Sequence, residues 1–222
     1  MNAPSPLNAE PVEECPRCGR PPALCVCAEI TPIANRVAVL ILQHPQEQDR
    51  ELGTAQLAAL SLTHATLKTG LSWPSLPKAL GKQVDPKRWA ILYLGSASAE
   101  TLPRDREIVA LDAKGAALPD RDQAKLLGDI QGIIVLDGSW SQAKTLWWRN
   151  AWVLKCRRVA LNPKRKSLYG KLRREPRREG LATIEAIGLA LSLIEKRPEM
   201  ATKLDGNFMR LLNRFHTKAA QT

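Results

Sequence analysis

The chain has 222 residues, of which 44% are apolar and 25% charged, and its formal net charge is +11. This length suits one α/β domain with a small appendage, and it is sufficient for a large core. No apolar run approaches the about 20 residues of a membrane-spanning helix, which excludes a transmembrane protein. The first predicted segment, residues 1–13, carries Pro and acidic residues where an export signal has basic and then apolar ones. We therefore expect a disordered leader and a cytoplasmic protein.

Four of the five cysteines follow this leader in the pattern C-x2-C-x6-C-x-C. Zinc binds four thiolates in a tetrahedron, and two chelating pairs joined by a turn can supply them. Two disulfides are the alternative, which a reducing cytosol disfavours. We expect a closed structural zinc knuckle over residues 14–34, and iron in place of zinc is left open at this point. The expected metal ligands are Cys15, Cys18, Cys25 and Cys27. The fifth cysteine, Cys156, is interpreted as a small apolar residue rather than a nucleophile.

Apolar runs and stretches of helical spacing alternate through the rest of the chain. The apolar runs predict strands at residues 37–42, 89–94, 108–111, 133–136 and 159–161. The helical spacing predicts helices at residues 49–63, 121–127, 141–149, 184–195 and 199–215. This alternation predicts an α/β domain over residues 35–222, with a mostly parallel sheet and helices on both faces. Ligands of such sheets bind beyond the carboxyl ends of the strands, so the residues after each run are the candidates for function.

The tetrapeptide DGSW, residues 137–140, directly follows one of these apolar runs. Ser139 and Gln142 have the spacing of a capping box, which gives the tetrapeptide a purely structural interpretation. A carboxylate at the end of a strand, beside a hydroxyl and an indole, can also take a proton or hold a cationic ligand. Asp137 is therefore the main candidate for chemistry at this edge.

The excess of positive charge is confined to one segment. Residues 144–178 hold 13 Lys or Arg and one acid, whereas the rest of the chain holds 20 basic and 21 acidic residues. A confined excess is typical of a surface that binds a polyanion, and the nearby tryptophans and tyrosine favour a nucleic acid. A solvated basic face without a partner is the alternative.

Five blocks of the sequence resemble the DTW-domain family of tRNA-uridine aminocarboxypropyltransferases, which are relatives of the SPOUT RNA methyltransferases. In the family's order, the blocks are the cysteine head, His44-Pro45-x-Glu47-x-x-Arg50 with Thr54, Asp137 to Trp140 with Ala143, Ser167-x-Tyr169-x-x-x-Arg173 with Glu175-Pro176, and Thr183-x-Glu185-Ala186. Two positions depart from the family's pattern, since Ser139 replaces a Thr and Ala182 stands where a Ser is expected. Neither departure removes an ionisable group.

The resemblance implies a fold and a reaction. The implied fold is SPOUT-like, with a C-terminal trefoil knot. The implied reaction transfers the 3-amino-3-carboxypropyl group of S-adenosyl-L-methionine to N3 of a uridine in tRNA and releases methylthioadenosine. We therefore expect tRNA and S-adenosyl-L-methionine as partners, and a monomer is favoured. The alternatives are an S-adenosyl-L-methionine-dependent RNA methyltransferase on the same scaffold, and a non-catalytic zinc-containing RNA-binding protein.

The resemblance also implies roles for individual residues. Asp137 is the candidate base for the N3 proton, or else it orients the donor, and the expected catalytic group is Asp137, Ser139 and Trp140. The expected residues for binding S-adenosyl-L-methionine are Thr54, Leu94, Gly95, Asp137, Trp140, Leu161, Ser167, Thr183 and Glu185. The expected RNA contacts are His44, Arg50, Lys164, Arg165, Lys166, Tyr169, Arg173 and Arg174. Most of these residues also have an ordinary interpretation as a helix cap, a core side chain or a solvated charge.

Overall fold

The computed structural model describes residues 13–93, 102–170, 172 and 180–221. Their central feature is a six-stranded sheet of order β2-β1-β5-β3-β6-β4. The strands are β1 (Ala38–Gln43), β2 (Ala65–Thr69), β3 (Trp89–Leu92), β4 (Ile108–Leu111), β5 (Gly132–Asp137) and β6 (Arg157–Leu161). Neighbouring strands are parallel except for β4, which pairs antiparallel with β6 at one edge. The predicted α/β class and mostly parallel sheet are confirmed.

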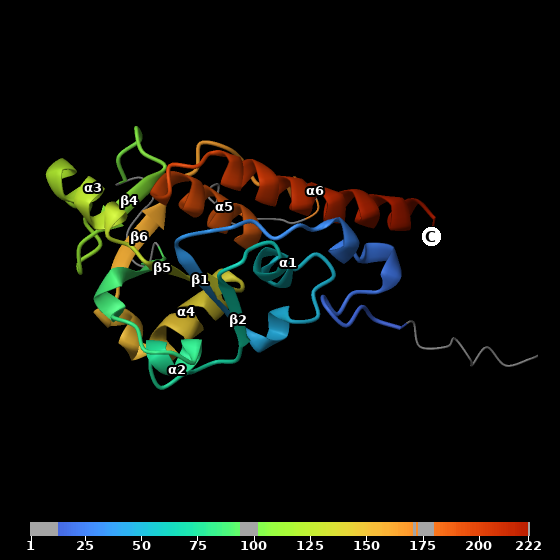
Figure 1. Ribbon diagram of the computed structural model, residues 1–222, viewed down its shortest axis with the longest axis horizontal. Helices are drawn as coiled ribbons and strands as arrows, with labels where there is room; N and C mark the ends of the chain where they lie inside the picture. Colours follow the sequence, from blue (N-terminus) through green and yellow to red (C-terminus); the bar gives the residue numbers. More distant parts are fainter. Residues whose placement is uncertain (1–12, 94–101, 171, 173–179, 222) are drawn as a thin grey trace, which may run out of the picture.

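Helices cover both faces of the sheet (Figure 1). The helices are α1 (Ala55–Leu60), α2 (Leu76–Leu80), α3 (Asp120–Gly128), α4 (Trp140–Arg149), α5 (Thr183–Ile194) and α6 (Glu199–Ala220). Helices α1, α5 and α6 lie on one face, whereas α2 and α4 lie on the other (Figure 1). Within the described residues, no helix combines the length and the apolar character needed to cross a membrane.

Alternation along the strands produces the two cores, because successive side chains of a strand point to opposite faces. In β1, Val39 and Ile41 pack into the core shared with α1, α5 and α6. Leu40 and Leu42 pack into the core on the other face, which includes Leu76 of α2. Strand β1 is therefore buried on both faces, as its continuous apolar run predicts.

The long helix α6 packs along α5 and reaches the cysteine-rich segment (Figure 1). The two helices come close at Gly188, where a Cβ would lie 3.2 Å from the Cα of Ala201. Near the other end of α6, Arg214 donates to the carboxylate of Glu29 at 2.6 Å. The buried Leu24 belongs to the same core as the sheet and these helices. The cysteine-rich segment is therefore packed onto the rest of the chain rather than tethered beside it.

One predicted helix is wrong in its extent. Helical spacing predicts a helix over residues 49–63 that begins at Asp49, but α1 spans only Ala55–Leu60. The residues before it form a loop whose backbone carbonyls accept hydrogen bonds from side chains of other segments, including the hydroxyl of Tyr169 on Leu52 O at 2.6 Å. These carbonyls accept hydrogen bonds from distant side chains, and the chain becomes helical only after them. The strand β2 and the helix α2 have no counterpart among the predicted elements.

Candidate functional site

A row of polar side chains lies where three parallel strands end. Asp137 is the last residue of β5, Gln43 the last of β1 and Thr69 the last of β2, and the three pair in register across the sheet. Gln43 Nε2 donates to Asp137 Oδ2 at 3.0 Å, and Thr69 Oγ1 donates to Gln43 Oε1 at 3.1 Å. This edge of the sheet is the place where ligands of parallel α/β sheets bind.

The carboxylate of Asp137 is anchored on both oxygens. Its Oδ1 accepts a hydrogen bond from the hydroxyl of Thr183, the first residue of α5. Asp137 is only 8% exposed. A carboxylate has about four acceptor positions, and the side chains of Gln43 and Thr183 occupy two of them. The remaining positions can accept a proton or a cationic donor from a ligand.

Ser139 begins the helix that follows this strand. Its Oγ accepts from Gln142 N at 3.4 Å, and Gln142 Oε1 accepts from Ser139 N at 2.6 Å, which completes the predicted capping box. The preceding Gly138 leaves room for this contact, since a Cβ there would lie 2.8 Å from Gln142 Cβ. The Ser139 hydroxyl therefore serves the helix start, and Trp140 follows it as a half-buried first residue of α4.

The start of α5 is held by a second carboxylate. Glu185 is fully buried, and its Oε2 accepts from Ala182 N at 2.9 Å and from the hydroxyl of Ser167. Its Oε1 accepts from Leu168 N at 3.0 Å and lies 3.4 Å from Arg165 Nη1. These partners occupy the carboxylate, so Glu185 holds the 165–168 segment onto α5 and has no exposed surface of its own for a ligand.

Thr54 connects α1 to the same helix start. It is 3% exposed, and its Oγ1 accepts from Ile184 N at 3.3 Å. The first N–H groups of a helix have no partner within the helix, and this bond satisfies one of them. The structure therefore brings together three residues expected to bind S-adenosyl-L-methionine, namely Thr54, Asp137 and Thr183, around the N-terminus of α5.

Arg20 is a site-supporting residue that the sequence did not reveal. It is 6% exposed and donates through Nε to Glu51 O at 3.2 Å and through Nη2 to Gly53 O. The intervening carbonyl of Leu52 accepts from Tyr169, so three consecutive carbonyls before Thr54 are held by distant side chains. The Nη1 of Arg20 is buried without a partner among the described residues. Nothing in the composition of the cysteine-rich segment distinguishes this arginine from an exposed one.

Tyr169, one of the expected RNA contacts, lies in the core of the structure. Tyr169 is 3% exposed, and its ring packs edge-on against Phe208 with centroids 4.8 Å apart. A ring enclosed in this way has no face for a nucleobase. Its hydroxyl is satisfied in this position, because it donates to Leu52 O at 2.6 Å.

The other expected RNA contacts differ in their surroundings. Arg165 forms ion pairs with Asp205 at 2.8 Å and with Glu185. Arg50 is exposed and lies 3.9 Å from the carboxylate of Glu47. His44 is half-buried at the site edge, and its backbone N donates to Asp137 O at 2.9 Å.

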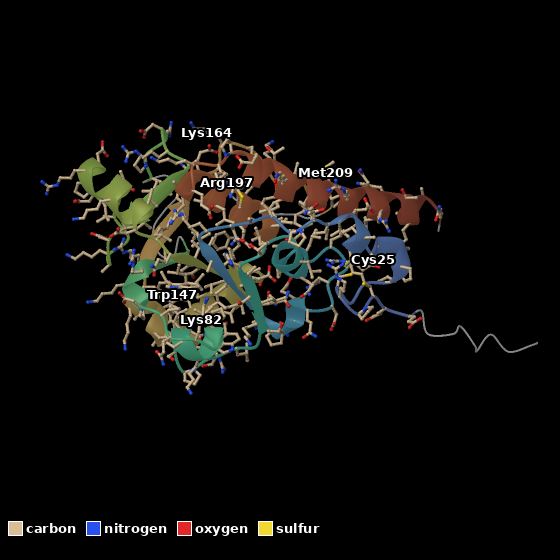
Figure 2. The ribbon with its side chains drawn as sticks, in the orientation of Figure 1. Cys25, Lys82, Trp147, Lys164, Arg197 and Met209 are labelled. Atoms are coloured by element: carbon tan, nitrogen blue, oxygen red, sulfur yellow. The ribbon has the colours of Figure 1, made fainter. Side chains whose placement is uncertain are left out.

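The remaining predicted site residues differ in exposure and position. Lys164, labelled in Figure 2, and Lys166 are exposed, and neither forms an ion pair with any residue in the described ranges. Leu161 is half-buried at the end of β6, and Ser167 contacts Glu185. Leu94, Gly95, Arg173 and Arg174 lie outside the described residues.

The four clustered cysteines have the geometry of a zinc site. Their Sγ atoms all lie within 4.8 Å of one another, with 3.9 Å between Cys15 and Cys27 and 3.8 Å between Cys18 and Cys25. A tetrahedron of zinc–sulfur bonds of about 2.3 Å has edges of about 3.8 Å, so the four thiols fit the metal. Figure 2 shows Cys25 in this cluster, near the C-terminal half of α6.

The cysteine thiols differ in their ionisation. Backbone N–H groups of Arg17 and Cys18 lower the pKa of Cys15 to about 6, whereas burial raises the pKa of Cys27. Burial also raises the pKa of the distant Cys156 to about 12, so that side chain is a neutral thiol at physiological pH. This agrees with the interpretation of Cys156 as a small apolar residue.

Comparison with known proteins identifies the family. The DTW domain model matches residues 12–216, which is most of the chain. The chain therefore belongs to the DTW domain family. A protein named tRNA-uridine aminocarboxypropyltransferase 2 from Macaca fascicularis is 29% identical over 203 residues, covering 86% of this chain and 60% of that protein. The protein of the same name from Drosophila melanogaster is 26% identical over 207 residues, covering 89% of this chain and 74% of that protein.

The chain thus spans about three fifths of the length of the Macaca protein and of the Mus musculus protein of the same name. No solved structure matches this DTW domain chain. The family match includes the cysteine cluster, the row of polar residues at the sheet edge and the start of α5.

Proposed function

We propose that this protein modifies tRNA by transferring the 3-amino-3-carboxypropyl group of S-adenosyl-L-methionine to N3 of a uridine, releasing methylthioadenosine. The observation that carries the proposal is the anchored carboxylate of Asp137 at the carboxyl edge of the parallel sheet, in a DTW domain chain. The names of the similar proteins support the same reaction class.

The proposed chemistry needs a base for the N3 proton of uridine and a donor whose γ-carbon faces N3. Uridine N3 attacks the γ-carbon of the aminocarboxypropyl arm, the bond between this carbon and sulfur breaks, and its electron pair goes to sulfur. The N3 proton goes to a carboxylate oxygen of Asp137. Three carbons are bonded to the sulfonium, and the one that faces N3 reacts. Gln43 and Thr183 hold the carboxylate in a single orientation for this step.

The residues around Asp137 support donor binding. Thr54 and Thr183 lie at the start of α5, and Trp140 at the start of α4 adds a large apolar side chain. We propose that Thr54, Trp140, Leu161, Ser167 and Thr183 surround the donor, together with Leu94 and Gly95, and that Glu185 acts by holding Ser167. Ser139 contributes by fixing the start of α4 beside Asp137.

The metal and the finer fold are also proposed. Cys15, Cys18, Cys25 and Cys27 would hold a structural zinc ion, which supplies no chemistry because its four positions are filled by thiolates. We propose a SPOUT-like domain over residues 35–222 with a C-terminal trefoil knot, on the basis of the family relationship. A monomeric, cytoplasmic enzyme that contacts tRNA through His44, Arg50, Lys164, Arg165, Lys166, Arg173 and Arg174 completes the proposal.

The deciding experiment follows the donor's atoms. The protein is incubated with unmodified tRNA and with S-adenosyl-L-methionine labelled either in the methyl or in the carboxyl carbon. We expect only the carboxyl label to enter the RNA. Methyl label in the RNA would indicate a methyltransferase instead, and tRNA binding without either label would indicate a non-catalytic RNA-binding protein.

The Asp137→Asn variant tests the role of the carboxylate, since it keeps the shape of the side chain and removes the basic group. We expect turnover to fall about 10² to 10⁴-fold, the range of a general base, while the donor still binds. Full activity of the variant would show that Asp137 is not the base.

A further inference from the structure

The outer face of α4 carries an aromatic side chain that the fold does not use. Trp148 is 72% exposed, and it is the largest of the exposed apolar side chains in the described residues. Its neighbour Trp147 turns the other way and stacks on Tyr93 with ring centroids 4.8 Å apart. Figure 2 shows Trp147 among the elements on the α2 and α4 side of the sheet. Packing therefore explains Trp147 and leaves Trp148 unexplained.

The exposed residues of this helix form a continuous strip. Ser141, Lys144 and Trp148 are all exposed, whereas Ala143 and Leu146 are buried. Residues three or four positions apart are neighbours on a helix surface, so Lys144 lies beside Trp148. We call the strip formed by Ser141, Lys144 and Trp148, together with the exposed Arg149 at the end of the helix, the α4 outer face.

This face begins at the candidate site. Helix α4 starts three residues after Asp137, at Trp140. Trp148 is eight residues further, which at 1.5 Å per residue is about 12 Å along the helix axis. A stacked nucleic-acid strand advances about 3.4 Å per nucleotide, so this distance corresponds to about three or four nucleotides.

The charge around Trp148 is positive and not neutralised. Lys144 and Arg149 are exposed, as is Lys155 shortly after the helix. None of the three forms an ion pair with another residue in the part of the chain that the structure describes. The sequence has no acidic residue between Asp137 and Glu175. Two copies of this chain meeting here would place like charges together, whereas a polyanion with flat, exposed rings complements both features.

We propose that the α4 outer face docks tRNA beside the target uridine, with Trp148 stacking on a base about three or four nucleotides away and Lys144 and Arg149 contacting phosphates. This rests on the proposed function, because it takes tRNA as the substrate. The face lies at the start of the basic segment, at residues other than the expected RNA contacts, and its central contact is an exposed ring without charge.

Substitutions of Trp148 and Lys144 distinguish the contribution of base stacking to tRNA affinity from that of phosphate contacts. Binding of fluorescently labelled, unmodified tRNA is measured by anisotropy at several salt concentrations, without S-adenosyl-L-methionine. We expect Trp148→Ala to weaken binding about 5- to 100-fold, the range found for removing a base-stacking aromatic, and Trp148→Phe to retain most of the affinity. The slope of log affinity against log salt stays unchanged in Trp148→Ala, because no phosphate contact is lost. Lys144→Ala reduces that slope by about 1.

Met209→Ala is the matched control, since Met209 is an exposed apolar residue of α6 on another side of the molecule (Figure 2). We expect it to bind tRNA as the wild type does. An unchanged thermal unfolding midpoint of Trp148→Ala, measured by circular dichroism, establishes that the variant is folded. At saturating tRNA, Trp148→Ala should transfer the carboxyl label at the wild-type rate, with a raised KM for tRNA.

The outcomes distinguish this inference from the proposed function. Wild-type affinity of Trp148→Ala, in a protein that still transfers the carboxyl label, overturns the docking surface and leaves the proposed function standing. A wild type that does not bind tRNA overturns both. Self-association of the wild type that Trp148→Ala abolishes without a change in tRNA affinity, measured by light scattering, would assign the face to a second copy and overturn the inference.

Discussion

At the scale of single residues, the candidate base is oriented by side chains that are not themselves reactive. Thr183 donates its hydroxyl to Asp137, and Gln43 donates its amide from the neighbouring strand. A hydrogen bond to a charged group contributes about 1.5 to 3 kcal/mol. Each donor therefore restricts the carboxylate enough to affect the proposed proton transfer, which depends on the direction of the accepting oxygen.

Replacing Thr183 with Val tests this orientation. The variant keeps the shape of the side chain and loses the donor, so we expect kcat to fall about 10- to 100-fold, in line with that bond energy, with little change in the KM for tRNA. Thr183→Ser, which keeps the hydroxyl, should restore most of the rate. Steady-state kinetics of carboxyl-label transfer measure both. A raised KM with normal kcat would contradict the orienting role.

A second residue-scale feature lies between α5 and α6, where Lys196 has a φ of 56°. This left-handed conformation costs a residue with a Cβ about 1 kcal/mol, and glycine adopts it without that cost. We expect Lys196→Gly to raise the free energy of unfolding by about 0.5 to 1 kcal/mol in urea denaturation. Lys203→Gly, within α6, should lower it by about 1 kcal/mol, because glycine weakens a helix interior. Destabilisation by both variants would refute the argument.

At the scale of helices and strands, the sequence predicts the elements whose pattern of apolar residues is set by the element itself. Strands β1 and β5 are buried on both faces, and their apolar runs predict them to within about one residue at each end. The edge strand β2 is half-exposed and alternates weakly, so it has no such run. The 49–63 stretch has helical spacing, but tertiary hydrogen bonds to its carbonyls shorten the helix to α1. Long-range contacts of this kind leave no local signal.

The same limit applies to the candidate site. Asp137 is predictable because it ends a recognisable strand. Its partner Gln43 is 94 positions away, and only the parallel register of β1 with β5 brings the two together. The burial of Tyr169 is equally invisible in the sequence, since it depends on Phe208 in α6.

The loop before α1 yields an element-scale prediction. Arg20 donates to the carbonyls of Glu51 and Gly53, and a side chain without N–H groups at position 20 would remove both hydrogen bonds. We expect Arg20→Met to lower the free energy of unfolding by about 2 to 3 kcal/mol, since the two hydrogen bonds donated by the buried Arg20 side chain are lost. Arg17→Met is the control from the same cysteine-rich segment, where the exposed side chain bonds Cys27 O at 3.3 Å, and it should cost less than about 1 kcal/mol. Equal losses in urea denaturation would contradict a special role for Arg20.

At the scale of the whole molecule, the cysteine cluster, the loop before α1 and α6 form one connected unit. Glu29, two residues after Cys27, is paired with Arg210 and Arg214 of α6. Lys218, near the end of α6, pairs with Glu51 of the loop. Arg20 joins that loop to the cysteine-rich segment. A change at the cysteine cluster can therefore reach Thr54 and the start of α5 through bonds that are all present in the structure.

Removal of the proposed zinc ion tests this connection. Because folding and zinc binding are coupled in such sites, we expect a strong chelator to lower the thermal unfolding midpoint of the whole chain in a single transition rather than melting the cysteine-rich segment alone. Cys27→Ser should bind less zinc and unfold at a lower temperature. Cys156→Ser should keep the wild-type zinc content, since Cys156 lies outside the cluster. Calorimetry and metal analysis measure these properties. Two separate transitions, or a midpoint unaffected by complete zinc removal, would show that the cluster is energetically independent of the sheet.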